Sequence, residues 1–239
     1  MLDIRPCSYD AAHFAVMRWH YSKTMPSSSL VKYGVWEDGL FIGAVLFGRG
    51  STITYAKSLG VGPFEVCELV RVALTDHTAP VTEIVARCIK ALKADNPGLR
   101  VILSFADPNH GHHGGIYIAG NWIYLGTSDD HHSAPILAGG RLIHARTVSA
   151  IIKSNGGRMD GESQLDAIRR ITHDPDAHRP PVLSKHRYVY PLDKGARRMM
   201  MRRSLPYPEP CGQGVDGDTT GFRPVDPGST PGARSAIRH

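Results

Sequence analysis

Apolar runs separated by short polar or glycine-containing breaks dominate the pattern of this chain. The runs at residues 40–47, 65–74 and 99–103 are short and rich in Val, Ile and Leu, which predicts buried strands. Asp38-Gly39 lies between the first run and residues 33–36, and Asp-Gly between two apolar segments is a strong hairpin signal. Residues 65–74 are apolar on both alternating faces and are therefore expected to form a central strand.

Other segments follow the helical period. Residues 9–20 and 80–95 each carry a continuous apolar face, and Asn96-Pro97-Gly98 ends the second helix. We expect Thr78 to cap that helix and Pro80 to lie in its first turn. Short helices are predicted at 115–120 and 163–171 and strands at 121–126 and 186–192, whereas residues 51–63 look irregular and residues 141–148 fit a strand or the start of a helix. This order predicts a mixed α/β sheet with flanking helices.

Length and composition are those of a globular protein with a hydrophobic core. The chain has 239 residues, of which 41% are hydrophobic, so it is long and apolar enough to bury a core. We expect one α/β domain over residues 1–195 and, over residues 196–239, a basic and then Pro/Gly-rich disordered tail. No signal-like N-terminus, membrane-length apolar run or CxxC pair is present in the sequence, which favours a cytoplasmic protein without a cysteine zinc site. The net charge of +6 favours an anionic partner.

One stretch, residues 104–124 (SFADPNHGHHGGIYIAGNWIY), concentrates the candidate chemistry. Directly after the predicted strand at 99–103, polar and titratable side chains arrive within ten residues: Ser104, Asp107, His110, His112 and His113. A buried strand that ends in such a loop is a common way for a rigid scaffold to present functional groups. Because imidazole and carboxylate groups also bind iron or zinc, a metal-dependent enzyme using His110, His112 and His113 is one alternative.

Charged residues elsewhere suggest contacts with phosphate. Glu68 and Arg71 interrupt the central strand, which is costly for buried charges unless they are paired or functional. Residues 75–80 lead from that strand into a helix, and a helix N-terminus in this position favours anions. Arg49 lies in a Gly-Arg-Gly turn that lets backbone and guanidinium approach phosphate.

Several segments together resemble the Mom family of phage DNA-modification proteins. They are HYS (20–22), YGVWEDGLFIGAVLFGRG (33–50), ELVRVAL (68–74), SFADP (104–108), HHGGIYIAGNWIYLG (112–126) and HRYVYPL (186–192). That family converts adenine in phage DNA to an N6-carbamoylmethyl derivative, which protects the DNA from host restriction. The resemblance implies a fold similar to GNAT acyltransferases, double-stranded DNA as the partner, and no role for a membrane.

The resemblance to GNAT enzymes also implies where a donor would lie. In that fold the donor occupies the gap where two neighbouring parallel strands separate, and its pyrophosphate meets the N-terminus of the next helix. Transferred to this sequence, the donor-contacting residues are Val70, Arg71, Val72 and Ala73, with His77 and Thr78 at the phosphate. The usual glycine-rich signature of that loop is missing here.

The chemistry assigns candidate roles to the matched residues. Adenine N6 is a poor nucleophile, so an enzyme must remove a proton and stabilise charge on the activated carbonyl. Asp107 or His20 is the candidate base, Tyr21 stacks on the flipped base or donates a proton, Ser104 orients base or donor, and Tyr117 acts as an acid. The candidate nucleic-acid contacts are Arg49, Lys57, Arg197, Arg198, Arg202 and Arg203.

The product constrains the donor. The N6–CH2–CO–NH2 group joins nitrogen to a methylene carbon, which simple acetyl transfer does not make, so acetyl-CoA and glycyl-tRNA both stand as candidate donors. With glycyl-tRNA, tRNA becomes a second partner. The rival classes are the metal-dependent enzyme named above, a GNAT acyltransferase with another substrate, and a DNA-binding protein without catalytic activity.

Overall fold

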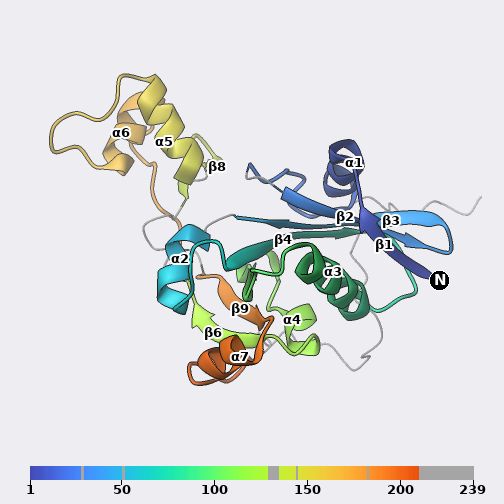
Figure 1. Cartoon of the computed structure of the whole chain (residues 1–239). Coiled ribbons are helices and arrows are strands. Elements are labelled where there is room, and N and C mark those ends of the chain that lie inside the picture. The colour runs from blue at the N-terminus through green and yellow to red at the C-terminus, as the bar shows by residue number, and fades with distance from the viewer. Residues whose placement is uncertain (28–29, 50–51, 129–134, 144, 182, 210–239) are drawn as a thin grey trace, which may run out of the picture.

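The computed structural model describes residues 1–27, 30–49, 52–128, 135–143, 145–181 and 183–209 (Figure 1). Its main feature is a seven-stranded mixed sheet in the order β1-β2-β3-β4-β5-β9-β6, so the predicted mixed α/β class is confirmed. The strands are β1 (Leu2–Pro6), β2 (Leu30–Glu37), β3 (Leu40–Gly48), β4 (Val66–Leu74), β5 (Val101–Ala106), β6 (Ile123–Thr127) and β9 (His186–Pro191). Among the described residues, no helix is long and apolar enough to cross a membrane.

Strands β4 and β5 are parallel, whereas the other neighbouring pairs of this sheet are antiparallel. They pair only over Val66–Glu68 and Val101–Leu103, although β4 continues to Leu74 and β5 to Ala106. The two strands therefore separate halfway along, which is the feature expected from the resemblance to GNAT enzymes. Ser104 is the first residue of β5 beyond the paired part.

Helices cover both faces of the sheet. Helix α3 (Val81–Asp95) and the short α4 (Gly115–Ala119) share one hydrophobic cluster with Val45, Phe47 and Ile102. On the opposite face, α1 (Tyr9–Trp19) packs on Ala44 and Leu46 of β3. Helices α2 (Thr52–Leu59) and α7 (Lys194–Met201) cover Val101 and Leu103 of β5 on that same face. The alternation of side chains along β3 and β5 thus matches helices on two sides.

An insert between β6 and β9 forms a separate small unit that projects from the sheet in Figure 1. It contains the hairpin β7 (Ile136–Ala138) and β8 (Arg141–Ile143) and the helices α5 (Ala145–Ser154) and α6 (Gln164–Thr172). Its own buried cluster includes Ile136, Val148, Ile152 and Ile168. The ambiguous residues 141–148 thus hold both a strand and the beginning of a helix.

Four local predictions need correction. Strand β1 was not expected, and residues 51–63 contain α2, because Tyr55, Ala56 and Leu59 form an apolar face against the sheet. The N-cap of α3 is Pro80 and not Thr78, and no side-chain hydrogen bond caps this helix. Residues 196–201 belong to an ordered helix rather than a disordered tail, because Asp193 caps α7 and Ala196 and Met200 are buried.

Candidate active site

The functional candidates meet where β5 leaves the sheet. Ser104 lies on β5, and Asp107 follows this strand. His20 and Tyr21 come from the end of α1, and Tyr117 from α4. The structure therefore brings together the five residues that the sequence predicted as catalytic, although they come from three separate segments of the chain.

His20 is buried at the C-terminal end of α1. The backbone N–H of Ser22 donates to His20 Nδ1 at 3.1 Å, and the Ser22 hydroxyl lies 2.9 Å from the same atom. Since Nδ1 accepts a hydrogen bond, the neutral ring carries its proton on Nε2. Burial first, and then the positive charges of Arg71 and neighbouring groups, lower the pKa of His20 to about 3. The ring is therefore neutral at physiological pH and presents an N–H donor rather than a strong base.

Tyr21 is surrounded by imidazole rings. Its ring centroid lies 4.4 Å from that of His20, 4.7 Å from that of His112 and 5.0 Å from that of His110. Even so, 51% of Tyr21 remains exposed. Burial and the negative charge of Asp107 raise the pKa of its phenol, so the hydroxyl stays protonated. An exposed aromatic ring held by neighbouring rings is suited to stacking on a planar ligand.

Ser104 and Tyr117 form a buried hydrogen-bonded pair beneath this cluster. Ser104 Oγ lies 2.8 Å from the Leu69 carbonyl oxygen and 2.7 Å from the Tyr117 hydroxyl. The carbonyl can only accept, so when Ser104 donates its single proton to Leu69, the Tyr117 hydroxyl donates to Ser104. Burial raises the pKa of Tyr117 to about 12. The pair connects β4 and β5 at the point where the strands separate.

Asp107 holds the loop that follows β5. One carboxylate oxygen accepts from the Asn109 backbone N–H at 3.0 Å and from Asn109 Nδ2 at 2.8 Å. The other oxygen lies 3.4 Å from His110 Nδ1 and 3.5 Å from Lys185 Nζ. Burial alone would raise the pKa of Asp107, but the Asn109 hydrogen bonds and the Lys185 charge outweigh it and lower the pKa. Asp107 is therefore ionised, and it also caps the turn at Pro108–His110.

Packed tyrosine rings support the loop that carries His110, His112 and His113. The rings of Tyr117 and Tyr124 lie 5.0 and 5.2 Å from that of Tyr188. The Tyr188 hydroxyl donates to the His113 carbonyl oxygen at 2.6 Å. Gly114 has φ of +90°, and a Cβ atom there would lie 2.4 Å from the Tyr188 ring. Glycine is therefore required where the loop turns into α4.

The sequence did not assign roles to several of these supporting residues. They are Asn109, Tyr124, Lys185, His186 and Tyr188. Tyr188 lies in HRYVYPL (186–192), one of the segments that resemble the Mom family, and this was the sequence signal that could have identified it. Of the three histidines proposed as metal ligands, His110 and His112 lie beside Tyr21, whereas the His113 ring centroid lies 6.3 Å from that of His186. No three His, Cys, Asp or Glu side chains among the described residues form a metal-holding group.

Comparison with known proteins identifies the family. A family model described as the Mom protein family matches residues 1–209. The chain belongs to the Mom family. The protein named methylcarbamoylase mom of Escherichia phage Mu is 25% identical over 215 residues, which cover 87% of this chain and 84% of that protein.

Solved structures give weaker matches. The aminoglycoside acetyltransferase AAC(6')-Ib in complex with coenzyme A and kanamycin has a TM-score of 0.39 and 16% identity, over 54% of this chain and 87% of that chain. Malonyl-CoA decarboxylase from Agrobacterium vitis has a TM-score of 0.39 and 9% identity, over 85% of this chain and 64% of that chain.

In this Mom family member, the candidate donor residues of β4 have mainly structural contacts. Ala73 is buried against α1, and Val70 and Val72 pack on the clusters of opposite faces. Arg71 donates to the Thr24 carbonyl oxygen from Nε at 3.3 Å and from Nη2 at 3.2 Å. It thereby fastens the loop that carries Tyr21 to the central strand.

The turn that leads into α3 already holds the negatively charged side chain of Glu37. The Glu37 carboxylate accepts from the backbone N–H groups of Thr78 and Ala79, both at 2.7 Å. These hydrogen bonds lower the pKa of Glu37, so the carboxylate is ionised. His77 Nδ1 lies 2.7 Å from the Ala79 carbonyl oxygen and has its own local partner. A pyrophosphate at His77 and Thr78 would have to displace Glu37 from the Thr78 and Ala79 N–H groups.

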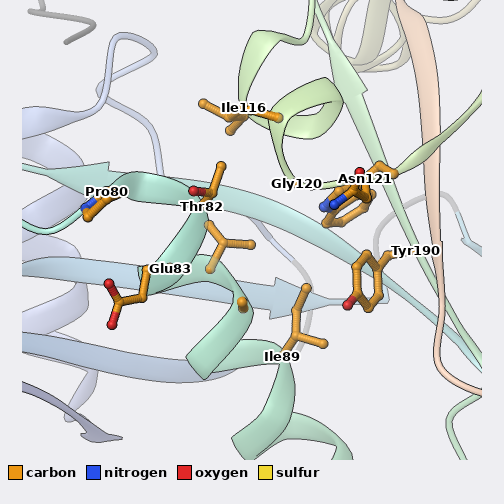
Figure 2. Close-up of a pocket in the computed structure, with 12 residues that line it drawn as sticks. Pro80, Thr82, Glu83, Ile89, Ile116, Gly120, Asn121 and Tyr190 are labelled. Carbon is orange, nitrogen blue, oxygen red and sulfur yellow. The ribbon is translucent and has the colours of Figure 1, made fainter. Parts of the chain in front are cut away.

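A cavity of about 350 Å³ between α3 and α4 lies next to that helix end. In Figure 2, Thr82 and Ile89 of α3 lie on one side of the cavity and Asn121 and Tyr190 on the other. None of the described residues that line it is Lys or Arg, and Glu83 adds a negative charge. The cavity therefore lacks the cations that a phosphate-rich donor requires.

The predicted nucleic-acid contacts divide into two places. Arg203 Nη1 donates to the Ser58 carbonyl oxygen at 2.5 Å, which places the arginines of α7 and its C-terminal end beside Lys57 of α2. The exposed cations of this α2–α7 surface are Lys57, Lys194, Arg197, Arg198, Arg202 and Arg203. Arg49 lies elsewhere, with its guanidinium carbon 4.6 Å from the Phe64 ring centroid and Nη2 donating to the Pro63 carbonyl oxygen at 3.2 Å. The polar residues 129–132 lie outside the described residues.

Proposed function

We propose that this protein is a DNA-modifying transferase that builds a carbamoylmethyl group on N6 of adenine and thereby protects DNA from restriction. The observation that carries the proposal is the convergence of His20, Tyr21, Ser104, Asp107 and Tyr117 in a chain of the Mom family. These residues belong to the sequence segments that carry the resemblance. The Mu relative's name, methylcarbamoylase, supports the same class of reaction.

The target base has to leave the duplex to reach this site, which costs a few kcal/mol. Tyr21 is the residue best placed to compensate by stacking, because its ring is half exposed and held by three imidazoles. Stacking a base on an aromatic side chain contributes roughly 1–3 kcal/mol. The Nε2–H group of neutral His20 is a suitable donor to a ring nitrogen of the base.

In the transfer step, adenine N6 attacks the carbonyl carbon of the donor. A bond from N6 to that carbon forms, and the bond from the carbon to the carrier oxygen or sulfur breaks. Asp107 is ionised and accepts the proton that N6 loses as the new bond forms. Tyr117 is protonated at neutral pH and supplies a proton to the departing carrier, with Ser104 as its hydrogen-bond partner.

A glycyl donor accounts for the product better than an acetyl donor. After glycyl transfer, the free amine attacks C6 through a five-membered ring, and the C6–N6 bond then breaks. The amine nitrogen becomes the new N6, and the original N6 becomes the terminal amide. Glu37 at the α3 N-terminus and the absence of lining cations in the neighbouring described cavity also count against coenzyme A. Glycyl-tRNA is therefore the donor we favour over acetyl-CoA.

The DNA would lie against the α2–α7 surface. This surface connects with the site through Tyr55 of α2, whose ring centroid lies 5.4 Å from that of Phe105, two residues before Asp107. Contacts of lysine and arginine with phosphates make binding fall steeply with salt. Binding of duplex DNA by the full-length protein is accordingly expected to weaken strongly between about 50 and 200 mM salt.

The test is to express the protein in bacteria, digest the DNA to nucleosides and measure their masses. We expect a deoxyadenosine carrying the added CH2–CO–NH2 group, and much less of it with Tyr21→Ala, which removes the stacking ring. DNA that contains only unmodified deoxyadenosine, with folded protein present, would contradict the proposal. Purified protein with duplex DNA and either glycyl-tRNA or acetyl-CoA then distinguishes the donors.

A further inference from the structure

The hairpin of the insert has a tight tip that the site described above does not use. Gly139 and Gly140 have φ values of +55° and +70°, so both residues of the turn adopt conformations that favour glycine. Strands β7 and β8 pair from Ile136 with Ile143 to Ala138 with Arg141. The result is a short two-stranded ribbon.

The tip of this ribbon is braced from behind. The Gly139 N–H donates to Asp174 Oδ2 at 2.7 Å. Leu137 and His178 exchange backbone hydrogen bonds of 2.8 and 3.1 Å, and Ile136 and Ala138 are buried in the core of the insert. The ribbon therefore has a fixed position on the insert, which limits the entropy lost when it binds a partner.

The exposed residues of the ribbon are a cation and an apolar group on opposite faces, because Arg141 pairs with Ala138 and Leu142 pairs with Leu137. Arg141 is exposed, and 62% of the neighbouring Leu142 is exposed. Within the described part of the chain, no carboxylate lies in ion-pair distance of Arg141 or of the exposed Lys153 and Arg158. The insert's own acids are partly neutralised, because Glu162 pairs with Arg170 and Asp166 with Arg169. The exposed cations favour an anionic partner.

The insert emerges at the edge of the candidate active site. His186, the first residue after the insert, pairs with Ala106 on β5 and with Thr127 on β6. Leu183 is joined to Asn109 by two hydrogen bonds, of 2.8 and 2.9 Å, and Asn109 in turn holds Asp107. The segment that leads from the insert back into the sheet therefore contacts the loop that positions Asp107.

From these features we propose that the insert is a duplex-docking arm, whose β7–β8 tip enters a groove of the DNA next to the target adenine. The inference rests on the proposed function, since it concerns the same substrate. The major groove admits a two-stranded ribbon, and apolar side chains next to arginine are frequent in groove binding. Arg141 would contact phosphate or a base edge, and Leu142 would pack against the groove wall.

The experiment compares the double variant Arg141→Ala/Leu142→Ala with wild type and with Lys90→Ala, in the full-length protein. Lys90 is an exposed lysine on α3, so Lys90→Ala removes one positive charge outside the insert. It also serves as the control for a companion variant in the insert, Lys153→Ala. Affinity for a labelled duplex is measured over a range of salt concentrations. We expect the double variant to lose about tenfold in affinity and to show a smaller salt slope, and Lys90→Ala to match wild type.

Hydrogen exchange gives a second measurement that needs no variant. The amides of residues 136–143 are expected to exchange more slowly when the duplex is added to wild-type protein. Two results would each overturn the proposal of a docking arm and leave the proposed function standing. One is a double variant that binds the duplex like wild type, and the other is unchanged exchange at the tip in a protein that binds DNA. If the arm variants weaken binding of tRNA but not of duplex DNA, the assigned partner is wrong. Wild-type protein that binds no duplex rejects both proposals.

Discussion

The turn before α3 and the C-terminal end of β5 differ in whether their polar groups already have partners within the chain. In the turn before α3, the backbone N–H groups of Thr78 and Ala79 are bound by Glu37, a residue of the same chain. At the end of β5, Tyr21 remains half exposed among imidazoles, and Asp107 stays ionised. The two amides of this turn are already occupied by an internal anion, whereas the strand end keeps groups that a substrate can contact.

The largest effect is expected from Asp107→Asn, which removes the charge at the strand end. If Asp107 accepts a proton, adenine modification should fall by about a hundredfold or more. Asparagine caps a turn nearly as well as aspartate, so thermal stability should change little. Near-normal modification by a folded Asp107→Asn protein, measured by nucleoside mass spectrometry, would mean that this residue only caps the turn.

Gly114→Ala tests whether the strand-end site depends on its support. The new Cβ would lie 2.4 Å from the Tyr188 ring at a positive φ, so we expect destabilisation of roughly 1–3 kcal/mol. The neighbouring variant Gly115→Ala is the control, because its Cβ would have no described heavy atom within 4 Å. Thermal denaturation compares the two, and equal melting temperatures would exclude the tight contact with Tyr188.

His20 predicts a pH dependence of stability. Its pKa is about 3 in the folded protein, below the ordinary value of 6.5, so the unfolded chain binds more protons between these values. The stabilising contribution is present above pH 6.5 and is lost as the pH falls toward 3. The His20 contribution to the free energy of unfolding should decrease by about 1 kcal/mol per pH unit in this window. Chemical denaturation at several pH values should show a flatter profile for His20→Gln, while exposed His13→Gln should follow wild type.

The smallest effect is expected from Glu37→Ala, which frees the α3 N-terminus. If the donor does not use this end of the helix, modification should change by less than about twofold, within the range of an ordinary surface substitution. Calorimetry with coenzyme A should detect no binding to wild-type protein. Tight coenzyme A binding by the wild-type protein would contradict the distinction between the two ends.

The sequence predicted the strands best, because burial on both faces produces nearly continuous apolar runs in β3, β4 and β5. It predicted which residues gather at the site but not their partners. Nothing local to Glu37 indicates that it will reach Thr78, since that contact exists only after the hairpin packs beside α3. Helix α2 was missed because its apolar face is short. Helix α7 was missed because Met200 becomes buried only when it packs into the cluster that α2 and the sheet share.

The position of the insert also has a consequence for synthesis of the protein. Strand β5 pairs with β9, and Ala106 pairs with His186. The edge of β5 that faces β9 therefore stays uncovered until residue 186 has been synthesised. Until the ribosome has produced the whole insert and β9, the growing chain has an uncovered strand edge in its apolar centre. Such edges pair readily with other chains. Fragments that stop before residue 186 should therefore aggregate, and rapid folding of the insert would shorten the time during which β5 is vulnerable.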